Sequence, residues 1–131
     1  MILSKEKPQI YETLHKIFGV EWDNGVIITY GDTVYCKFDL GWDKRVHEAV
    51  HVRQQKEMGA EAWWNRYLED TEFRLSQELE AYKEEVKFLR QNIKDRNQLF
   101  RAIRQVSLDL SGSMYGNIIS YGEAFKILNG R

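Results

Sequence analysis

The chain has 131 residues, 43% of them hydrophobic, and its 19 basic and 20 acidic side chains nearly cancel to a net charge of −1. This length favours one domain, residues 1–131, and the balanced charge argues against binding of polyanions by the whole surface. The single cysteine, Cys36, excludes an intramolecular disulfide framework and suits a reducing compartment. The charged opening segment and the lack of a long apolar run predict a cytoplasmic protein with neither a secretory signal nor a membrane span.

The pattern of apolar residues predicts a mostly helical chain with a small sheet near its N-terminus. Ser4 can cap a first helix over residues 5–18, and residues 26–38 predict a two-stranded hairpin that turns at Gly31. Asp43 and Asp70 are placed to cap later helices. The predicted helices run over residues 44–58, 60–68 and 71–94, then from a break at 95–97 through 110, and over 121–128. The predicted class is α+β, mostly helical, with an N-terminal β-hairpin or small sheet.

One motif in the first long helix carries chemistry. Residues 47–51 read His-Glu-Ala-Val-His, which is H-E-x-x-H. The i, i+4 spacing puts the imidazoles of His47 and His51 on one helix face, one turn apart, so that both can bind one ion. Glu48 lies about 100° around the helix from His47, within reach of a metal-bound water but not itself a ligand. Two ordinary helix histidines are the alternative, although two of the chain's three histidines fall in this motif.

A catalytic zinc site needs a third protein ligand, and the longest predicted helix offers carboxylates. His15 lies on the polar side of its own predicted helix and is a weaker candidate. The apolar stripe of the long helix comprises Leu75, Leu79, Tyr82, Val86, Leu89 and Ile93. Relative to this stripe, Glu78 lies at the rim of the buried face, whereas Glu80 and Glu84 point to water. Glu85, two turns beyond Glu78, is the reserve candidate.

These motifs together resemble a known group of enzymes. HEAVH followed 27 residues later by ELEAY is similar to the gluzincin pattern, in which H-E-x-x-H precedes a glutamate on a second helix. Peptidases related to the CAAX-prenyl proteases carry E-x-x-A-D as the second motif. Glu78 and Ala81 match it, whereas Tyr82 stands in place of the aspartate. The runs VHEAVHVRQQ and RLSQELEAY are also similar to small metallopeptidases encoded by phages and prophages.

The resemblance covers about residues 43–82 and implies a minimal gluzincin, a zincin-like domain that hydrolyses peptide bonds. It implies a Zn²⁺ cofactor held by His47, His51 and Glu78, with Glu48 as the general base that takes a proton from zinc-bound water. The substrate would be a peptide or protein, in the host cytoplasm if a phage encodes the chain. The helix-face argument selects Glu78 without using the resemblance.

Further side chains are candidates for roles beside the metal. Gln54, two turns along from His47, could anchor the helix of Glu78 or line the cleft. Tyr82, Tyr115 and Tyr121 could stabilise an oxyanion, although the apolar stripe favours a core position for Tyr82. Asp70 could orient a histidine, but a helix cap is the favoured role.

Basic side chains gather in residues 83–104 and suggest a function of another class. They are Lys83, Lys87, Arg90, Lys94, Arg96, Arg101 and Arg104. The alternative is a non-catalytic zinc-scaffold protein that binds a host protein or nucleic acid through this surface. The scatter of these charges around the helices favours a solvated face instead. The presence of Glu48 and the lack of a fourth ligand in the sequence favour the enzyme.

Overall fold

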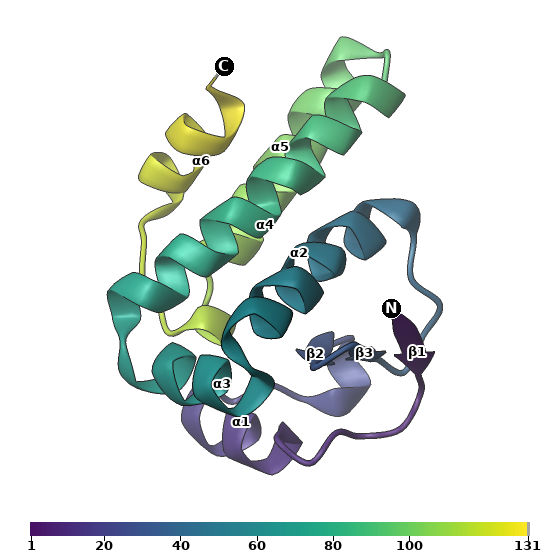
Figure 1. Ribbon diagram of the computed structural model, residues 1–131. Helices are drawn as coiled ribbons and strands as arrows, with labels where there is room; N and C mark the ends of the chain where they lie inside the picture. Colours follow the sequence, from purple (N-terminus) through teal and green to yellow (C-terminus); the bar gives the residue numbers. More distant parts are fainter. Residues whose placement is uncertain (131) are drawn as a thin grey trace.

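The computed structural model describes residues 1–130, in which helices pack against a small sheet (Figure 1). The elements are β1 (Ile2–Ser4), α1 (Tyr11–Phe18), the 3₁₀ helix η1 (Trp22–Asn24), β2 (Ile28–Tyr30), β3 (Thr33–Tyr35), α2 (Trp42–Met58), α3 (Ala60–Glu69), α4 (Thr71–Asn92), α5 (Arg96–Leu110), the 3₁₀ helix η2 (Ser113–Tyr115) and α6 (Tyr121–Asn129). The predicted class, α+β and mostly helical, is confirmed.

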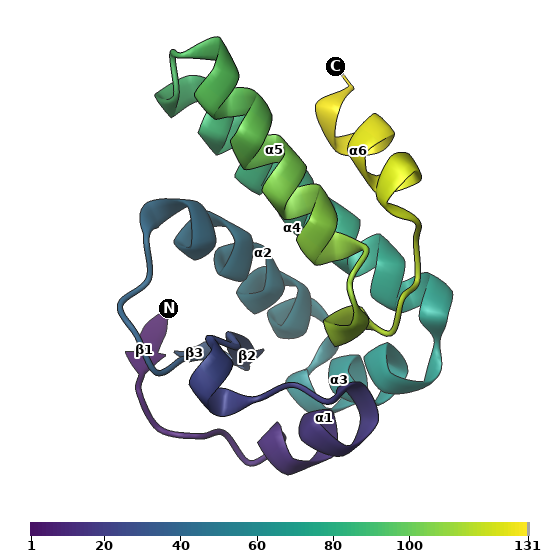
Figure 2. The same ribbon diagram turned by 180° about the vertical axis from the view of Figure 1, so that it is seen from behind.

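Helix α2, which carries the H-E-x-x-H motif, packs against both β2 and α4. Helices α4 and α5 form a long hairpin that extends past the N-terminal end of α2, and α6 runs beside it (Figures 1 and 2). Helix α3 is a short connector that contacts both α2 and α4. This arrangement places the two helices with predicted metal ligands side by side.

The N-terminal segment differs from the prediction. Residues 2–4 form β1, which pairs in parallel with β3 so that Leu3 lies opposite Val34, and the sheet order is β1-β3-β2. The first helix begins only at Tyr11, so the predicted helix start after Ser4 is wrong. A proline disfavours helical geometry in the residue before it, and Pro8 therefore opposes a helix through Lys7.

The predicted hairpin is confirmed, although its paired part is shorter. Strands β2 and β3 run antiparallel, with Thr29 opposite Val34. Gly31 lies in the turn with φ of +67°, a conformation that residues with a Cβ atom rarely adopt. Residues 26 and 27 stay outside the ladder and border the cavity described below.

The helix caps agree with the prediction in part. Asp70 accepts a hydrogen bond from the backbone N–H of Phe73 at 3.0 Å, which makes it the cap of α4, and Asp95 caps α5 in the same way. Asp43 lies in the first turn of α2, and the cap position is Gly41, so that prediction is wrong. Asp43 still favours the helix start, because a negative charge in the first turn interacts well with the helix dipole.

Two main clusters of buried apolar side chains flank α2 and the first half of α4. The first joins α1, η1, β2 and α3 and contains Tyr11, Leu14, Trp22, Ile28, Trp63, Trp64 and Tyr67, with Phe73 of α4. The second joins α4, α5 and α6 and contains Tyr82, Val86, Leu89, Ile103, Val106, Leu110, Ala124 and Leu128. Tyr115 packs against both clusters. Across residues 1–130, none of the helices has the length and apolar character that spanning a bilayer requires.

Candidate metal centre

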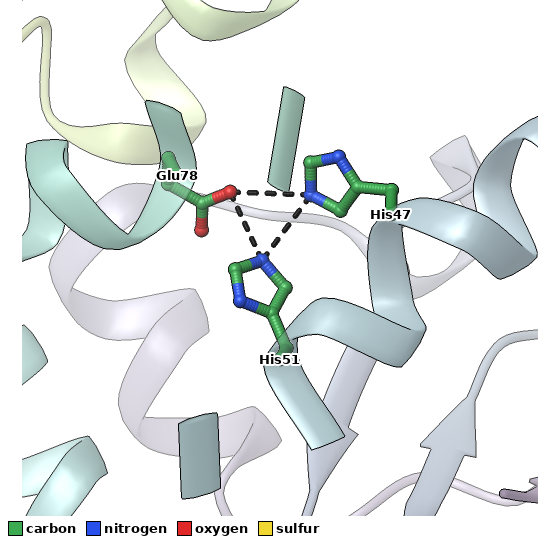
Figure 3. A group of neighbouring side chains, drawn as sticks. All are labelled: His47, His51 and Glu78. Atoms are coloured by element: carbon green, nitrogen blue, oxygen red, sulfur yellow. Dashed lines mark hydrogen bonds and ion pairs between the residues drawn. The ribbon is translucent and has the colours of Figure 1, made fainter. Parts of the chain in front are cut away.

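Three predicted ligands converge between α2 and α4. The Nε2 atoms of His47 and His51 lie 3.2 Å apart, and Glu78 Oε1 lies 3.2 Å from the first and 3.1 Å from the second (Figure 3). All three side chains are buried. The structure therefore brings together the two histidines of the motif and the glutamate that the helix-face argument selected, and they form a group that could hold a metal ion.

The spacing of these three atoms suits a tetrahedral metal ion. Ligand atoms bound to zinc at about 2.0–2.1 Å in a tetrahedron lie about 3.3 Å from one another. The three observed distances, 3.1–3.2 Å, are close to that value. Two imidazole nitrogens and one carboxylate oxygen also make up the ligand set of many catalytic zinc sites.

The charge of the surroundings fits a divalent cation as well. Glu48, Glu78 and Glu85 are 6%, 3% and 0% exposed. Within residues 1–130, the lysine or arginine paired with these carboxylates is Lys44, whose Nζ lies 2.8 Å from Glu85 Oε2. With neutral histidines, three carboxylates and one ammonium leave two negative charges in a buried place, which is unfavourable unless a cation compensates them.

Each histidine has a partner on the nitrogen that faces away from the group. His47 Nδ1 lies 2.9 Å from Glu85 Oε1, and His51 Nδ1 lies 2.8 Å from Gln54 Oε1. Coordination through Nε2 requires that Nδ1 carry the hydrogen and donate it, so both contacts fix the required tautomer and ring orientation. Glu85, the reserve candidate for third ligand, therefore serves as a hydrogen-bond acceptor for His47.

Gln54 also links α2 to α4, which agrees with its predicted role as an anchor for the helix of Glu78. Its Nε2 donates to the backbone carbonyl of Gln77 at 3.2 Å and to Glu80 Oε1 at 2.7 Å. Arg53 donates to the other oxygen of Glu80 at 2.6 Å. Glu80 is exposed, as predicted. It supports the site indirectly, because it accepts a hydrogen bond from Gln54, whose Oε1 contacts His51.

A tyrosine from α3 holds the second oxygen of Glu78. Tyr67 donates its hydroxyl to Glu78 Oε2 at 2.6 Å. Burial and the nearby Glu78 carboxylate raise the pKa of Tyr67 well above its ordinary value, so the hydroxyl stays protonated and donates. Oε1 of Glu78 is thereby left to face the two histidines.

The general-base candidate, Glu48, is fixed by a strand residue. Thr29 Oγ1 of β2 donates to Glu48 Oε1 at 2.9 Å, and Glu48 Oε2 lies 3.7 Å from His47 Nε2. The carbonyl of Thr29 accepts from Gln55 Nε2 at 2.8 Å and from Trp64 Nε1 at 3.1 Å. Thr29 is thus held by two helices, and it leaves one oxygen of Glu48 directed at the ligand group.

Protonation at the group is set by the carboxylates around it. Burial alone lowers the pKa of His47, but Glu48, Glu78 and Glu85 outweigh burial and raise that pKa to about 10. Burial likewise opposes the rise in the pKa of His51, which Glu78 causes. Burial raises the pKa of Glu78, yet His51 and His47 hold it well below its usual range. Protons and a metal ion therefore compete for the Nε2 atoms, and metal affinity falls as pH falls.

The group opens into a cavity of about 440 Å³. Its walls come from the N-terminal third of the chain, from helices α2, α3 and α4, and from η2. Two of the three tyrosines considered as oxyanion donors, Tyr82 and Tyr115, border the cavity, and their hydroxyls lie 2.7 Å apart. Tyr82 is buried, and its ring packs edge-on against His47 with centroids 4.3 Å apart, which agrees with the core position favoured for it. Tyr115 is half-buried, while Tyr121 stacks on Phe125 of α6 and does not border the cavity.

Other predicted residues lie apart from the group. His15 Nδ1 contacts the carbonyl of Val20 at 2.8 Å, and Asp70 serves as a helix cap. The basic residues of 83–104 lie exposed or half-buried on α4, on α5 and in the turn between them. Sequence analysis missed Thr29, Tyr67 and Lys44, since no pattern in the sequence links them to the motif.

Replacement of Glu85 by glutamine tests the contact with His47. The variant keeps an acceptor oxygen but removes the negative charge, so we expect zinc affinity to fall by about ten- to a hundredfold. Competition with a chelator of known affinity measures the change. Glu84→Gln is the matched control, because Glu84 is the exposed neighbour on the same helix. Unchanged affinity in Glu85→Gln would mean that this contact does not support the site.

Comparison of the chain with models of protein families, with curated proteins and with solved structures finds no match.

Proposed function

We propose that the chain is a zinc-dependent metallopeptidase that hydrolyses peptide bonds with Glu48 as general base. The convergence of His47 Nε2, His51 Nε2 and Glu78 Oε1 supports this proposal most strongly. The donor set favours zinc, because imidazole nitrogen with one carboxylate is typical of its catalytic sites.

When bound, zinc would supply a water of lowered pKa and a Lewis acid for the scissile carbonyl. Glu48 would take a proton at Oε2 and deliver it to the nitrogen of the leaving amine. Thr29 would hold Glu48 in this orientation through Oε1. Glu85 and Gln54 would keep the histidines in the tautomer that binds metal through Nε2.

Two observations favour an enzyme over a non-catalytic zinc scaffold. A structural zinc site normally has four protein ligands, whereas this group has three among residues 1–130. The group also borders a cavity with Glu48 on its wall, so a substrate and a base would meet there.

The metal content of the protein, purified without added metal, tests the first part of the proposal. We expect about one zinc ion per chain in the wild type and almost none in His51→Ala, because two protein ligands hold zinc poorly. Elemental mass spectrometry measures the content, and circular dichroism checks that the variant is folded. His15→Ala is the control and keeps its zinc, since His15 lies outside the group. A wild-type protein that contains no zinc and takes up none on addition would overturn the proposal.

A further inference from the structure

The cavity beside the metal group has limited room. Its volume is about 440 Å³, within the range of sites that enclose small ligands, which corresponds to about two to four residues of peptide. The metal ligands lie at its wall and are each buried. A bond to be cleaved must therefore enter the cavity, because the ligands do not reach the outer surface.

Apolar side chains make up much of the cavity wall outside the metal group. Leu14 and Trp64 are buried in the first apolar cluster and form its inner wall. Phe18, Val26 and Met114 border it nearer the surface, and Met114 is 36% exposed. Burial of an apolar side chain against such walls is favourable. An acidic side chain would meet the carboxylates of Glu21 and Asp109, which also line the cavity. The lining cation Lys44 is already paired with Glu85.

One side of the cavity is bordered by α1 and the η2 segment, which lie in close contact. A Cβ atom at Gly116 would lie 3.3 Å from both Phe18 and Arg74, so the glycine permits a close approach. Arg74 is buried, with its guanidinium 5.0 Å from the centre of the Phe18 ring. It also donates to the carbonyls of Tyr115 at 2.9 Å and Tyr67 at 2.6 Å. These contacts fix the positions of Phe18 and Tyr115, which both border the cavity.

We infer that the site accepts a short, flexible peptide with a bulky apolar side chain next to the reacting bond, and that it excludes segments of folded proteins. The inference names the substrate class for the proposed peptidase and rests on that function for the cleavage itself. The preference for one side chain over another requires bound zinc and the cavity but no turnover, so it can be measured apart from cleavage.

Amino-acid hydroxamates test the cavity without any turnover. Phenylalanine hydroxamate and aspartate hydroxamate carry the same metal-binding group and differ in the side chain. On the zinc-loaded protein we expect the first to bind at least about tenfold more tightly by calorimetry, the scale on which apolar pockets discriminate. Equal affinities, or no binding of either compound, would overturn the inference.

A pair of surface variants locates the preference. Met114→Asp puts a charge at the rim of the cavity and should remove most of the preference for phenylalanine hydroxamate. Leu108→Asp is the matched control, because Leu108 is 37% exposed and lies outside the cavity. Both side chains reach solvent, so both variants should fold and keep zinc. An equal effect of the two variants would show that the preference arises elsewhere.

A cleavage experiment separates the inference from the proposed function. A folded protein and a digest of the same protein are each incubated with the zinc-loaded chain, and products are read by mass spectrometry. Cleavage of digest peptides beside large apolar residues, with the folded protein intact, supports both the proposed peptidase activity and the inferred substrate class. Selective hydroxamate binding without any cleavage contradicts the peptidase but supports the pocket. Equal cleavage of the folded protein contradicts the pocket but supports the peptidase.

Discussion

Exchange of Glu48 for glutamine is expected to lower peptide hydrolysis by about a hundred- to ten-thousandfold, the contribution of a positioned general base. Glutamine has nearly the same shape, and its carbonyl oxygen can still accept the hydrogen bond from Thr29 Oγ1. It cannot take a proton at the position of Oε2, which lies 3.7 Å from His47 Nε2. The rate is measured on the peptides that the wild type cleaves best.

The metal content of this variant decides how a loss of activity is interpreted. Glu48 is not among the three atoms that converge, so Glu48→Gln should hold as much zinc as the wild type. Loss of activity together with zinc would point to damage of the site and not to a missing base. Retained activity with zinc in place would contradict the assignment of Glu48 as the base.

Removal of the Glu78 carboxylate should have the largest effect on metal affinity. We expect Glu78→Ala to weaken zinc binding by more than about a hundredfold, beyond the range that loss of an outer hydrogen-bond partner produces. The variant leaves two ligands and also deprives the buried Tyr67 hydroxyl of its acceptor. That unpaired group would lower the free energy of unfolding by about 1–3 kcal/mol.

Three further variants separate ligand loss from damage to the fold. Glu78→Gln keeps an acceptor for Tyr67, so it should remain folded and still bind zinc weakly. Glu80→Ala should lower affinity by less than about tenfold, because Glu80 acts only through Gln54. Glu84→Ala should change nothing, since Glu84 is exposed on the far side of α4. Equal losses in Glu78→Ala and Glu80→Ala would contradict the assignment of the third ligand.

The helical part of the fold could be predicted because its signals are local. Asp70 and Asp95 cap their helices through bonds to residues two or three positions away, and Gly59 ends α2. Strand β1 could not be predicted in this way, because its partner β3 lies about thirty residues further along the chain. A three-residue strand whose pairing is distant leaves too short a pattern to recognise.

The same distinction applies to the metal group. His47 and His51 could be predicted because helix geometry alone puts them together, and Glu78 because the apolar stripe of α4 fixes which face is buried. The roles of Thr29 and Tyr67 depend on how β2 and α3 pack against the two long helices. Glu85 could be named as a reserve ligand because it lies two turns beyond Glu78, but its contact with Nδ1 of His47 depends on the exact offset between α2 and α4.

The two imidazoles pack against different apolar clusters. His47 lies against Tyr82 of the second cluster, with ring centroids 4.3 Å apart, and His51 lies against Trp63 of the first, at 5.5 Å. A bound ion would therefore link side chains that pack against two different apolar clusters. A substitution deep in either cluster, far from any ligand, would then change the distance between the two imidazole nitrogens. Metal affinity would therefore depend on how the two clusters are positioned relative to each other.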